Sequence, residues 1–474
     1  MTRRSGKLPR NMKFEFAIAT AFVIASIAFS ATAQSSDALL NKLVEKGILT
    51  TDEAKQLKAE SDQDFAAAMS AKNGMPEWVT SVRFGGDFRG RFDDIRAAND
   101  AAVDRARWRY RLRAGVTATI QDDFEVGLAL ISGDVDSGIS SGSSGLGSNQ
   151  SFQNNASKKG ILLDQAYAKW SPLHTEEWKG NVTFGKMKDP FVFSPLGSGL
   201  GLGFDPDYTP EGGAMQLEYS LNERHSVRWI NGAFVLDELS ASTDDPFLVG
   251  SQLRLESKWS SRVTSSAGVM LLAFANVDQL SNGSLPNANV GNWREISAGT
   301  NQSSAVPQFH FNPILADASV TYLFDHGPLY PGAFPVRVAG TYLNNPAAAS
   351  SADNYGWCAG FGFGKAGRRG SWELVWLYKW LGANAIWEEV VDDDFGAYWA
   401  TTAGTDFGLN DQGGYFTGTN VRGHIVRLAY SPTDFLTLSA KWYLTELIHA
   451  PALSPGMDVE SQVSRVQIDA LLKF

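Results

Sequence analysis

Sixteen segments of this chain alternate apolar and polar residues with a period of two. The last twelve residues show the pattern clearly: Arg465, Asp469 and Lys473 fall on one face, and Ile468 and Leu472 fall on the other. This period is that of a β-strand with one apolar and one polar face. A chain with so many strands of this kind must either stack two sheets against each other or close one sheet into a barrel.

The lengths of the connections distinguish these two architectures. The predicted strands cover 79–92, 105–120, 124–133, 161–171, 180–187, 213–220, 225–235, 248–260, 262–274, 314–324, 334–344, 354–364, 370–380, 420–431, 434–445 and 463–474. Connections after even-numbered strands are mostly short, as at 121–123 and 432–433, whereas those after odd-numbered strands are mostly long, as at 381–419. Transmembrane barrels have short periplasmic turns, long external loops and an even number of strands. A soluble sandwich has no reason to sort its loops in this way.

The apolar faces are rich in aromatic residues. In 370–380, Trp372, Trp376 and Trp380 share one face, where a barrel would meet lipid. We therefore predict an all-β fold, a transmembrane antiparallel β-barrel of about 16 strands. A barrel of this size leaves an aqueous lumen, so the polar face of the last strand is expected to line water.

The N-terminal region differs from the rest of the chain. Residues 1–33 have a basic start, an apolar run and an Ala31-Thr32-Ala33 cleavage motif, which predict a signal peptide, with translation starting at Met1 or Met12. Residues 34–77 contain apolar residues at helical spacing and a capping box at Thr50–Glu53, which predict a short α-helical periplasmic prefix. This prefix is either a coiled coil or hairpin that joins subunits or touches the cell wall, or a poorly ordered stub. The barrel then spans 78–474.

Composition excludes several classes of function. Removing residues 1–33 leaves 441 residues with a formal net charge near −14, which argues against a nucleic-acid partner. The single cysteine, Cys358, is expected to face inward as an unremarkable lining residue. The six histidines show no metal-ligand spacing, and the chain has no nucleophile-elbow or phosphate-loop motif. We therefore predict no enzyme activity, no metal and no cofactor.

Basic residues are concentrated on one face of the first two predicted strands. An arginine on the lipid face near the membrane midplane would cost about 2–4 kcal/mol, so these side chains are expected to point into the lumen. The predicted basic wall consists of Arg83, Arg89, Arg91, Arg105, Arg107, Arg109, Arg111 and Arg113.

The long connection 188–212 follows the fifth strand and carries acidic residues, namely Asp189, Asp205, Asp207 and Glu211. Its ending, Pro210-Glu211-Gly212-Gly213, is similar to the Pro-Glu-x-Gly-Gly pattern of general porin constriction loops but is one residue shorter. The resemblance implies that this loop folds into the barrel and narrows it. Acidic groups opposite an arginine wall would create a transverse field. The alternative is structural: the opposite charges neutralise each other and hold the loop.

A second acidic cluster, Glu388-Glu389 with Asp392-Asp393-Asp394, lies in the long connection 381–419. We expect it on an external loop, either as a solvated segment or bridging divalent ions to lipopolysaccharide.

As a whole, the mature chain resembles the outer-membrane porins of Gram-negative bacteria, in particular porins with a helical N-terminal prefix. The resemblance implies a channel for passive diffusion of ions and small hydrophilic solutes, a homotrimer in outer-membrane lipid and lipopolysaccharide, and a C-terminal Phe474 that is read by the barrel insertion machinery. The arginine wall favours anions and the net charge favours cations, so charge selectivity stays open. The alternatives are a substrate-selective channel for an anion, phosphate or a sugar, and a structural protein tethered to the cell wall.

Overall fold

The computed structural model describes residues 75–100, 102–133, 146–193, 196, 200–280, 290–295, 305–399, 414–449 and 460–474. The predicted signal peptide, and the predicted prefix up to residue 74, lie outside the described residues. Contacts divide the chain into residues 1–71 and 72–474, and the description below concerns the second unit.

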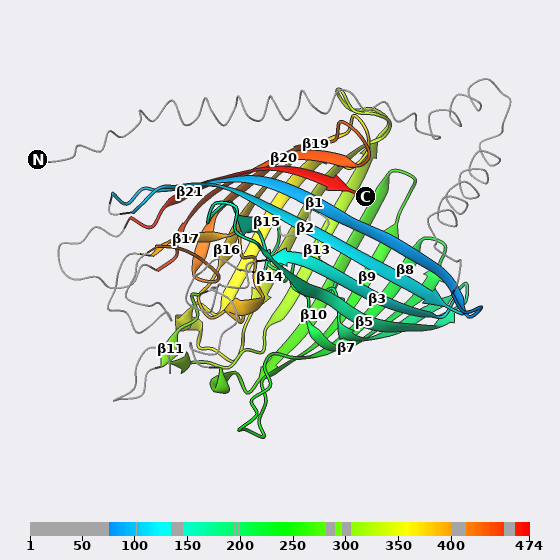
Figure 1. Cartoon of the computed structure of the whole chain (residues 1–474), viewed down its shortest axis with the longest axis horizontal. Coiled ribbons are helices and arrows are strands. Elements are labelled where there is room, and N and C mark those ends of the chain that lie inside the picture. The colour runs from blue at the N-terminus through cyan, green and yellow to red at the C-terminus, as the bar shows by residue number, and fades with distance from the viewer. Residues whose placement is uncertain are drawn as a thin grey trace, which may run out of the picture. The chain divides into compact units, whose positions relative to one another are not determined.

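This second unit is one antiparallel sheet that closes on itself (Figure 1). The sheet has 17 strands, of which the two-residue β4 (Gln150–Ser151) only adds to the edge of β2, so that sixteen strands form the wall. The wall strands are β1 (Val79–Ala97), β2 (Arg105–Ile120), β3 (Phe124–Gly133), β5 (Gly160–His174), β6 (Trp178–Lys186), β7 (Glu211–Asn222), β8 (His225–Val235), β9 (Phe247–Lys258), β10 (Val263–Ala275), β13 (Ile314–Phe324), β14 (Phe334–Asn344), β15 (Tyr355–Gly364), β16 (Trp372–Leu381), β19 (Val421–Tyr430), β20 (Leu436–Leu447) and β21 (Val463–Lys473).

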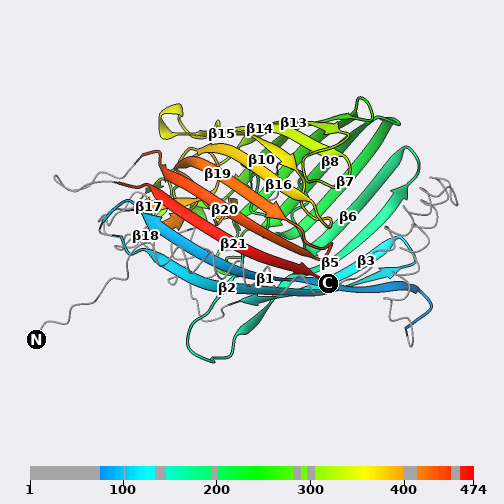
Figure 2. The same ribbon diagram turned by 90° about the horizontal axis from the view of Figure 1, so that it is seen from above.

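Closure occurs between the first and last wall strands. β1 pairs with β2 on one side and with β21 on the other, and Figures 1 and 2 show blue β1 running beside red β21. The chain end completes this seam, because Phe474 N donates to Gly86 O over 3.1 Å and Gly86 N donates to Phe474 O over 2.9 Å. Closure leaves no unpaired strand edge, which a sheet within a lipid bilayer requires.

All sixteen predicted strands are present, and five of them, including 105–120 and 314–324, agree at both ends. The largest difference is in β1, which continues to Ala97 instead of ending at residue 92. Ile95 still pairs with both Arg105 and Arg465, so β1 keeps two neighbours over these extra residues.

The connections alternate in length as predicted. Short ones such as 121–123 and 223–224 occur at one end of the barrel, and long ones such as 187–210 and 382–420 occur at the other. The long connections contain short elements: β4, η2 (Val277–Gln279), β11 (Arg294–Glu295), β12 (Val306–Pro307), η4 (Ser350–Ala352), η5 (Glu388–Val390), β17 (Gly396–Trp399) and β18 (Gly414–Thr417).

The outward face of the barrel is apolar and exposed. Phe84, Phe184, Leu253 and Val338 are each more than half exposed. A folded protein does not leave such a surface in water, whereas a transmembrane barrel places it against lipid. No helix among the described residues is long and apolar enough to cross a membrane.

The interior is not the fully open lumen that the strand count predicts. Inward-facing side chains of β8 to β20, such as Leu377 and Ile425, join loop residues in one buried apolar cluster. Trp387 and Trp399 come from the connection 382–420 and are at most 1% exposed. Cys358 faces inward as predicted, but it is buried in this cluster instead of lining water. The long connections therefore fill part of the barrel interior.

The seam gives a first testable prediction. A Cβ added at Gly86 would lie 2.1 Å from Arg113 O and 2.7 Å from Cζ of Phe474, whose ring covers this glycine. We expect Gly86→Ala to lower the free energy of unfolding by about 1–3 kcal/mol, the usual cost of overpacking. Denaturant titration of the folded barrel in detergent measures this change.

Gly213→Ala is the matched control, because its Cβ would meet no atom closer than 3.9 Å. Equal stabilities of the two variants would contradict the close packing of Phe474 on Gly86.

Candidate functional site

The predicted basic wall occupies one face of β1 and β2. Its eight arginines stand at alternate positions of these strands, while Phe84 and Leu112 at the intervening positions are exposed on the outside. Arg91 is 1% exposed and Arg111 is 2% exposed, so two basic side chains of this wall are buried. Burial of such charges is tolerated only with partners.

Acidic residues from the wall itself supply many of these partners. Asp87 accepts hydrogen bonds from Arg111 Nη2 over 3.2 Å and from Arg113 Nε over 2.9 Å. Asp93 is completely buried and accepts hydrogen bonds from Arg107 Nε over 2.9 Å and Arg465 Nε over 2.8 Å. Both aspartates share the inward register of β1 with the arginines, so the wall is less positive than the arginines alone predict.

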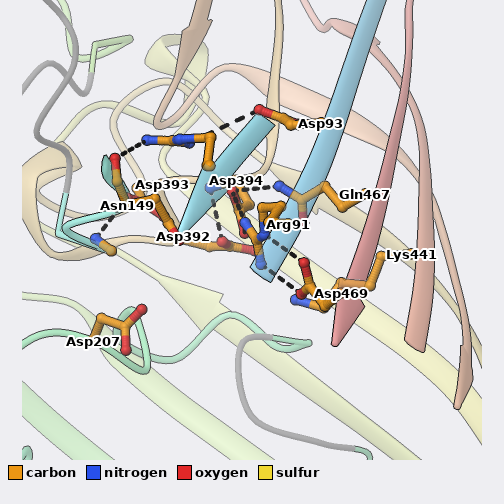
Figure 3. A network of polar contacts seen from close by, with 12 residues as sticks. Arg91, Asp93, Asn149, Asp207, Asp392, Asp393, Asp394, Lys441, Gln467 and Asp469 are labelled. Atoms are coloured by element: carbon orange, nitrogen blue, oxygen red, sulfur yellow. Dashed lines mark hydrogen bonds and ion pairs between the residues drawn. The ribbon is translucent and has the colours of Figure 1, made fainter. Parts of the chain in front are cut away.

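Arg91 links the seam to the interior. Its Nε donates to Asp469 of β21 over 2.7 Å, and its Nη1 donates to Asp394 over 3.2 Å. Figure 3 shows Arg91 between these two carboxylates. Arg465 also contacts Asp394, at 2.9 Å. Arg465 is 2% exposed and therefore does not line water, contrary to the expectation for the last strand.

Two other wall arginines contact a neutral residue. Arg89 Nη2 donates to Asn149 Oδ1 over 2.6 Å, and Arg109 Nη2 donates to the main-chain Asn149 O over 2.9 Å. Among the described residues no carboxylate lies within 4.0 Å of a basic nitrogen of Arg89. Arg89 thus has a neutral hydrogen-bond partner and no ion-pair partner within this distance among the described residues.

The connection 187–210 crosses the inside of the barrel. Val192 exchanges two hydrogen bonds with Gln252 on β9, and Arg254 on β9 donates to Val192 O. Further along, Asp207 accepts hydrogen bonds from Arg111 Nη1 over 2.7 Å and from Arg113 Nη1 over 3.0 Å. The connection thus spans from β9 to β2, as a loop that narrows the lumen would.

Of its four predicted acidic residues, only Asp207 reaches the arginines. Glu211 belongs to β7, where it pairs with Lys186 over 2.9 Å across the β6–β7 ladder. Asp189 accepts a hydrogen bond from its own loop at Phe191 N, and burial raises the pKa of Asp189 to about 7. Asp205 is buried at the junction with a second interior loop. The predicted field across the pore therefore involves one loop carboxylate instead of four.

This second interior loop, 382–399, is the part of the site that sequence reasoning placed wrongly. Glu388, Glu389 and Asp392 are 1%, 6% and 5% exposed, so the cluster is neither solvated nor placed to bridge lipopolysaccharide. Glu388 forms an ion pair with Arg294. The apolar residues around Trp387 join the interior cluster, which draws the acidic residues inside with them.

A cavity of about 760 Å³ lies along the arginine wall. Four acidic side chains line it, namely Asp87, Asp164, Asp207 and Asp469, and Phe474 adds the C-terminal carboxylate. Nine basic side chains line it: Arg83, Arg89, Arg91, Arg111, Arg113, Lys188, Arg427, Lys441 and Lys473. Arg105, Arg107 and Arg109 line none of the described cavities, because they lie towards the long-connection end, where Asp93 and Asn149 contact Arg107 and Arg109.

A second cavity of about 640 Å³ lies nearer the long connections. It reaches Ile131 on β3, whereas the first cavity reaches Gly127 of the same strand. Unlike the first cavity, it is lined mainly by acidic side chains. Lys186 is its one basic lining residue, and six lining residues are acidic: Asp164, Asp207, Glu211, Asp237, Glu238 and Glu389. Asp164 and Asp207 line both cavities, so the two cavities meet at these residues.

A closed barrel with an apolar outside and a charged inside defines the class of outer-membrane channel proteins. Residues 93–311 match the family model described as "Putative porin". This match confirms the resemblance to outer-membrane porins that the sequence suggested, and with it the outer-membrane location. No curated protein matches the chain in sequence.

Solved structures with similar folds are outer-membrane proteins at low identity. Pseudomonas putida OprB at high pH has 12% identity and a TM-score of 0.48, covering 83% of this chain and 94% of its own. Salmonella typhi OmpF in complex with daunomycin has 9% identity and a TM-score of 0.45, covering 84% and 99%. The Acinetobacter baumannii channel DcaP has 11% identity and a TM-score of 0.39, covering 83% and 97%.

Proposed function

We propose that this chain is an outer-membrane porin through which ions and small hydrophilic solutes diffuse passively, with a preference for small anions. The observation that supports it most directly is the pair of cavities that meet at Asp164 and Asp207 inside a closed barrel. Together they follow the inner faces of β1 to β5 and of β19 to β21, beside the interior loops. This route is the proposed water path, and loop 187–210 is its proposed constriction.

The anion preference follows from the charges of the cavity beside the arginine wall. Nine basic side chains and four acidic ones line the cavity beside the arginine wall. Fixed charges in a narrow, low-dielectric passage raise the local concentration of ions of opposite sign. Several arginines are neutralised by the wall aspartates, but Arg89 and Lys188 have no carboxylate partner within 4.0 Å among the described residues.

The N-terminal assignments are part of this proposal. We propose that residues 1–33 are a signal peptide, that 34–77 form a helical periplasmic prefix that joins subunits or contacts the cell wall, and that the barrel is a homotrimer inserted through recognition of Phe474. Deleting residues 36–71 should then change the oligomeric state or the envelope integrity, while the conductance of a single barrel stays the same. Crosslinking and bilayer recording measure the two effects. Loss of conductance in the deletion variant would contradict this division of roles.

The charge preference gives a direct prediction. Purified, folded protein should form stable conductance steps in a planar bilayer, and its reversal potential in a salt gradient should show anion preference. Lys188→Gln should lower the anion-to-cation permeability ratio roughly fivefold, because a unit charge about 8 Å away in water changes the energies of an anion and a cation by about 0.5 kcal/mol each, in opposite directions.

Lys158→Gln is the control for this variant, since Lys158 is an exposed loop residue outside the described cavities. A cation-preferring wild type, or equal shifts in the two variants, would contradict the proposed path.

The opposite charges of the two cavities give a further prediction. The acidic cavity near the long connections concentrates cations, and the basic cavity concentrates anions. A voltage that is positive on the long-connection side drives both ions towards the junction at Asp164 and Asp207 and fills it with carriers. We expect larger currents at this polarity than at the reverse one in low salt, and nearly symmetric currents in 1 M salt, where the screening length is about 3 Å. Larger currents at the reverse polarity would contradict the proposed charge arrangement.

A further inference from the structure

The two interior loops meet at a cluster of three carboxylates. Asp205 N donates to Val390 O over 2.9 Å, and Asp393 N donates to Asp205 Oδ2 over 2.9 Å, which joins loop 187–210 to loop 382–399. At this junction Asp205, Asp392 and Asp393 place carboxylate oxygens within 4.8 Å of one another. Figure 3 shows Asp392 and Asp393 beside Asp394 in the same loop.

Unlike their neighbours, these three carboxylates have no ion-pair partner. Asp207 pairs with Arg111 and Arg113, and Asp394 pairs with Arg91 and Arg465. For Asp205, Asp392 and Asp393, no basic nitrogen of a described residue lies within 4.0 Å. The buried Lys379 of β16 places its ammonium over the Phe395 ring at 4.5 Å.

Hydrogen bonds satisfy only part of the cluster. Main-chain N–H groups of Asp207 and Asp393 donate to Asp205, Gly147 N donates to Asp393 Oδ2, and Asp394 N donates to Asp392 Oδ1. The other Asp392 oxygen, Oδ2, is buried and accepts no hydrogen bond among the described residues. An ionised carboxylate in this position requires a cation.

The donors indicate which kind of cation. Sites made only of carboxylate oxygens bind hard cations, and Ca²⁺ accepts six to eight oxygens in irregular arrangements, whereas Mg²⁺ requires a near-octahedral one. Two oxygens on opposite sides of one Ca²⁺ ion lie about 4.6–5.2 Å apart, so oxygens within 4.8 Å can reach the same ion. We propose that Asp205, Asp392 and Asp393 bind one Ca²⁺ ion that fastens the two interior loops together.

Such an ion would also affect the channel. Asp207 lies two residues from Asp205 and borders both cavities. Loss of the ion would free the junction and let loop 187–210 move away from the arginine wall. The proposed site is therefore a structural support of the constriction and is separate from the route of the permeating ions.

Calorimetric titration of the full chain with CaCl₂ after removal of divalent ions by EDTA tests this site. We expect one ion per chain with a dissociation constant on the order of 0.1–1 mM, the range of weak Ca²⁺ sites. Asp392→Asn should weaken binding at least about tenfold. Asp244→Asn, which changes an exposed loop aspartate, should bind as the wild type does.

Two results would overturn the proposal: the absence of Ca²⁺ binding by the wild type up to 10 mM (roughly ten times the weakest affinity expected), or equal binding by Asp392→Asn. The first would mean that the carboxyl groups hold protons instead. If Asp392→Asn does not fold, the wild type still tests Ca²⁺ binding. Adding Ca²⁺ to the EDTA-treated wild type should raise its melting temperature and reduce its open-channel noise. The proposed porin function would survive failure of this test, since its own test is conductance.

Discussion

Asp394 is held by Arg91 from the first wall strand and by Arg465 from the last. Together with Asp93 and Asp469, these residues form one buried ion-pair network at the place where the barrel closes. Breaking a buried pair by removing one partner leaves a buried charge and typically costs 3–5 kcal/mol. The network therefore couples two features of the fold: closure of the sheet between β1 and β21, and the position of loop 382–399 inside it.

The loop held in this way divides the interior. Its apolar residues, with Trp387 at the centre, pack on the inward side chains of β8 to β20 and fill part of the interior. Its Asp393 N donates to Asp205 of loop 187–210, and this loop reaches the arginine wall through Asp207. The two cavities that meet at Asp164 and Asp207 lie on the side of β1 to β5 and β19 to β21. A third polar cavity of about 840 Å³ lies among β7 to β10 and β13, at the end with the short connections. A narrow passage between a basic wall and one loop carboxylate can select ions by charge, which an open lumen of sixteen strands does less well.

The strands could be predicted from the sequence because their two faces meet different surroundings. The alternation of Arg111 with Leu112 reports lipid on one side and a polar interior on the other, so both the strand and the inward direction of the arginines follow from the pattern. Asp87 and Asp93 stand in the same register of β1 as its arginines. The ion pairs between these two aspartates and the wall arginines could therefore also be predicted from the sequence. The contact of Asp394 with Arg91 was not, because it joins residues 303 positions apart through a loop without periodicity. For the same reason the acidic cluster at 388–394 was expected outside, although its neighbours Trp387 and Val390 are apolar enough to bring it into the barrel.

Cysteine accessibility tests most directly the claim that water passes through the basic cavity and is excluded from the apolar cluster of the interior loops. The native Cys358 is buried and would be replaced by serine. Single cysteines would then be placed at Ser439, which lines the basic cavity, and at Leu377, which is 1% exposed in the apolar cluster. A charged methanethiosulfonate reagent added during bilayer recording should reduce the conductance of Ser439→Cys and leave that of Leu377→Cys unchanged. Block at position 377 without block at position 439 would contradict the proposed division of the barrel.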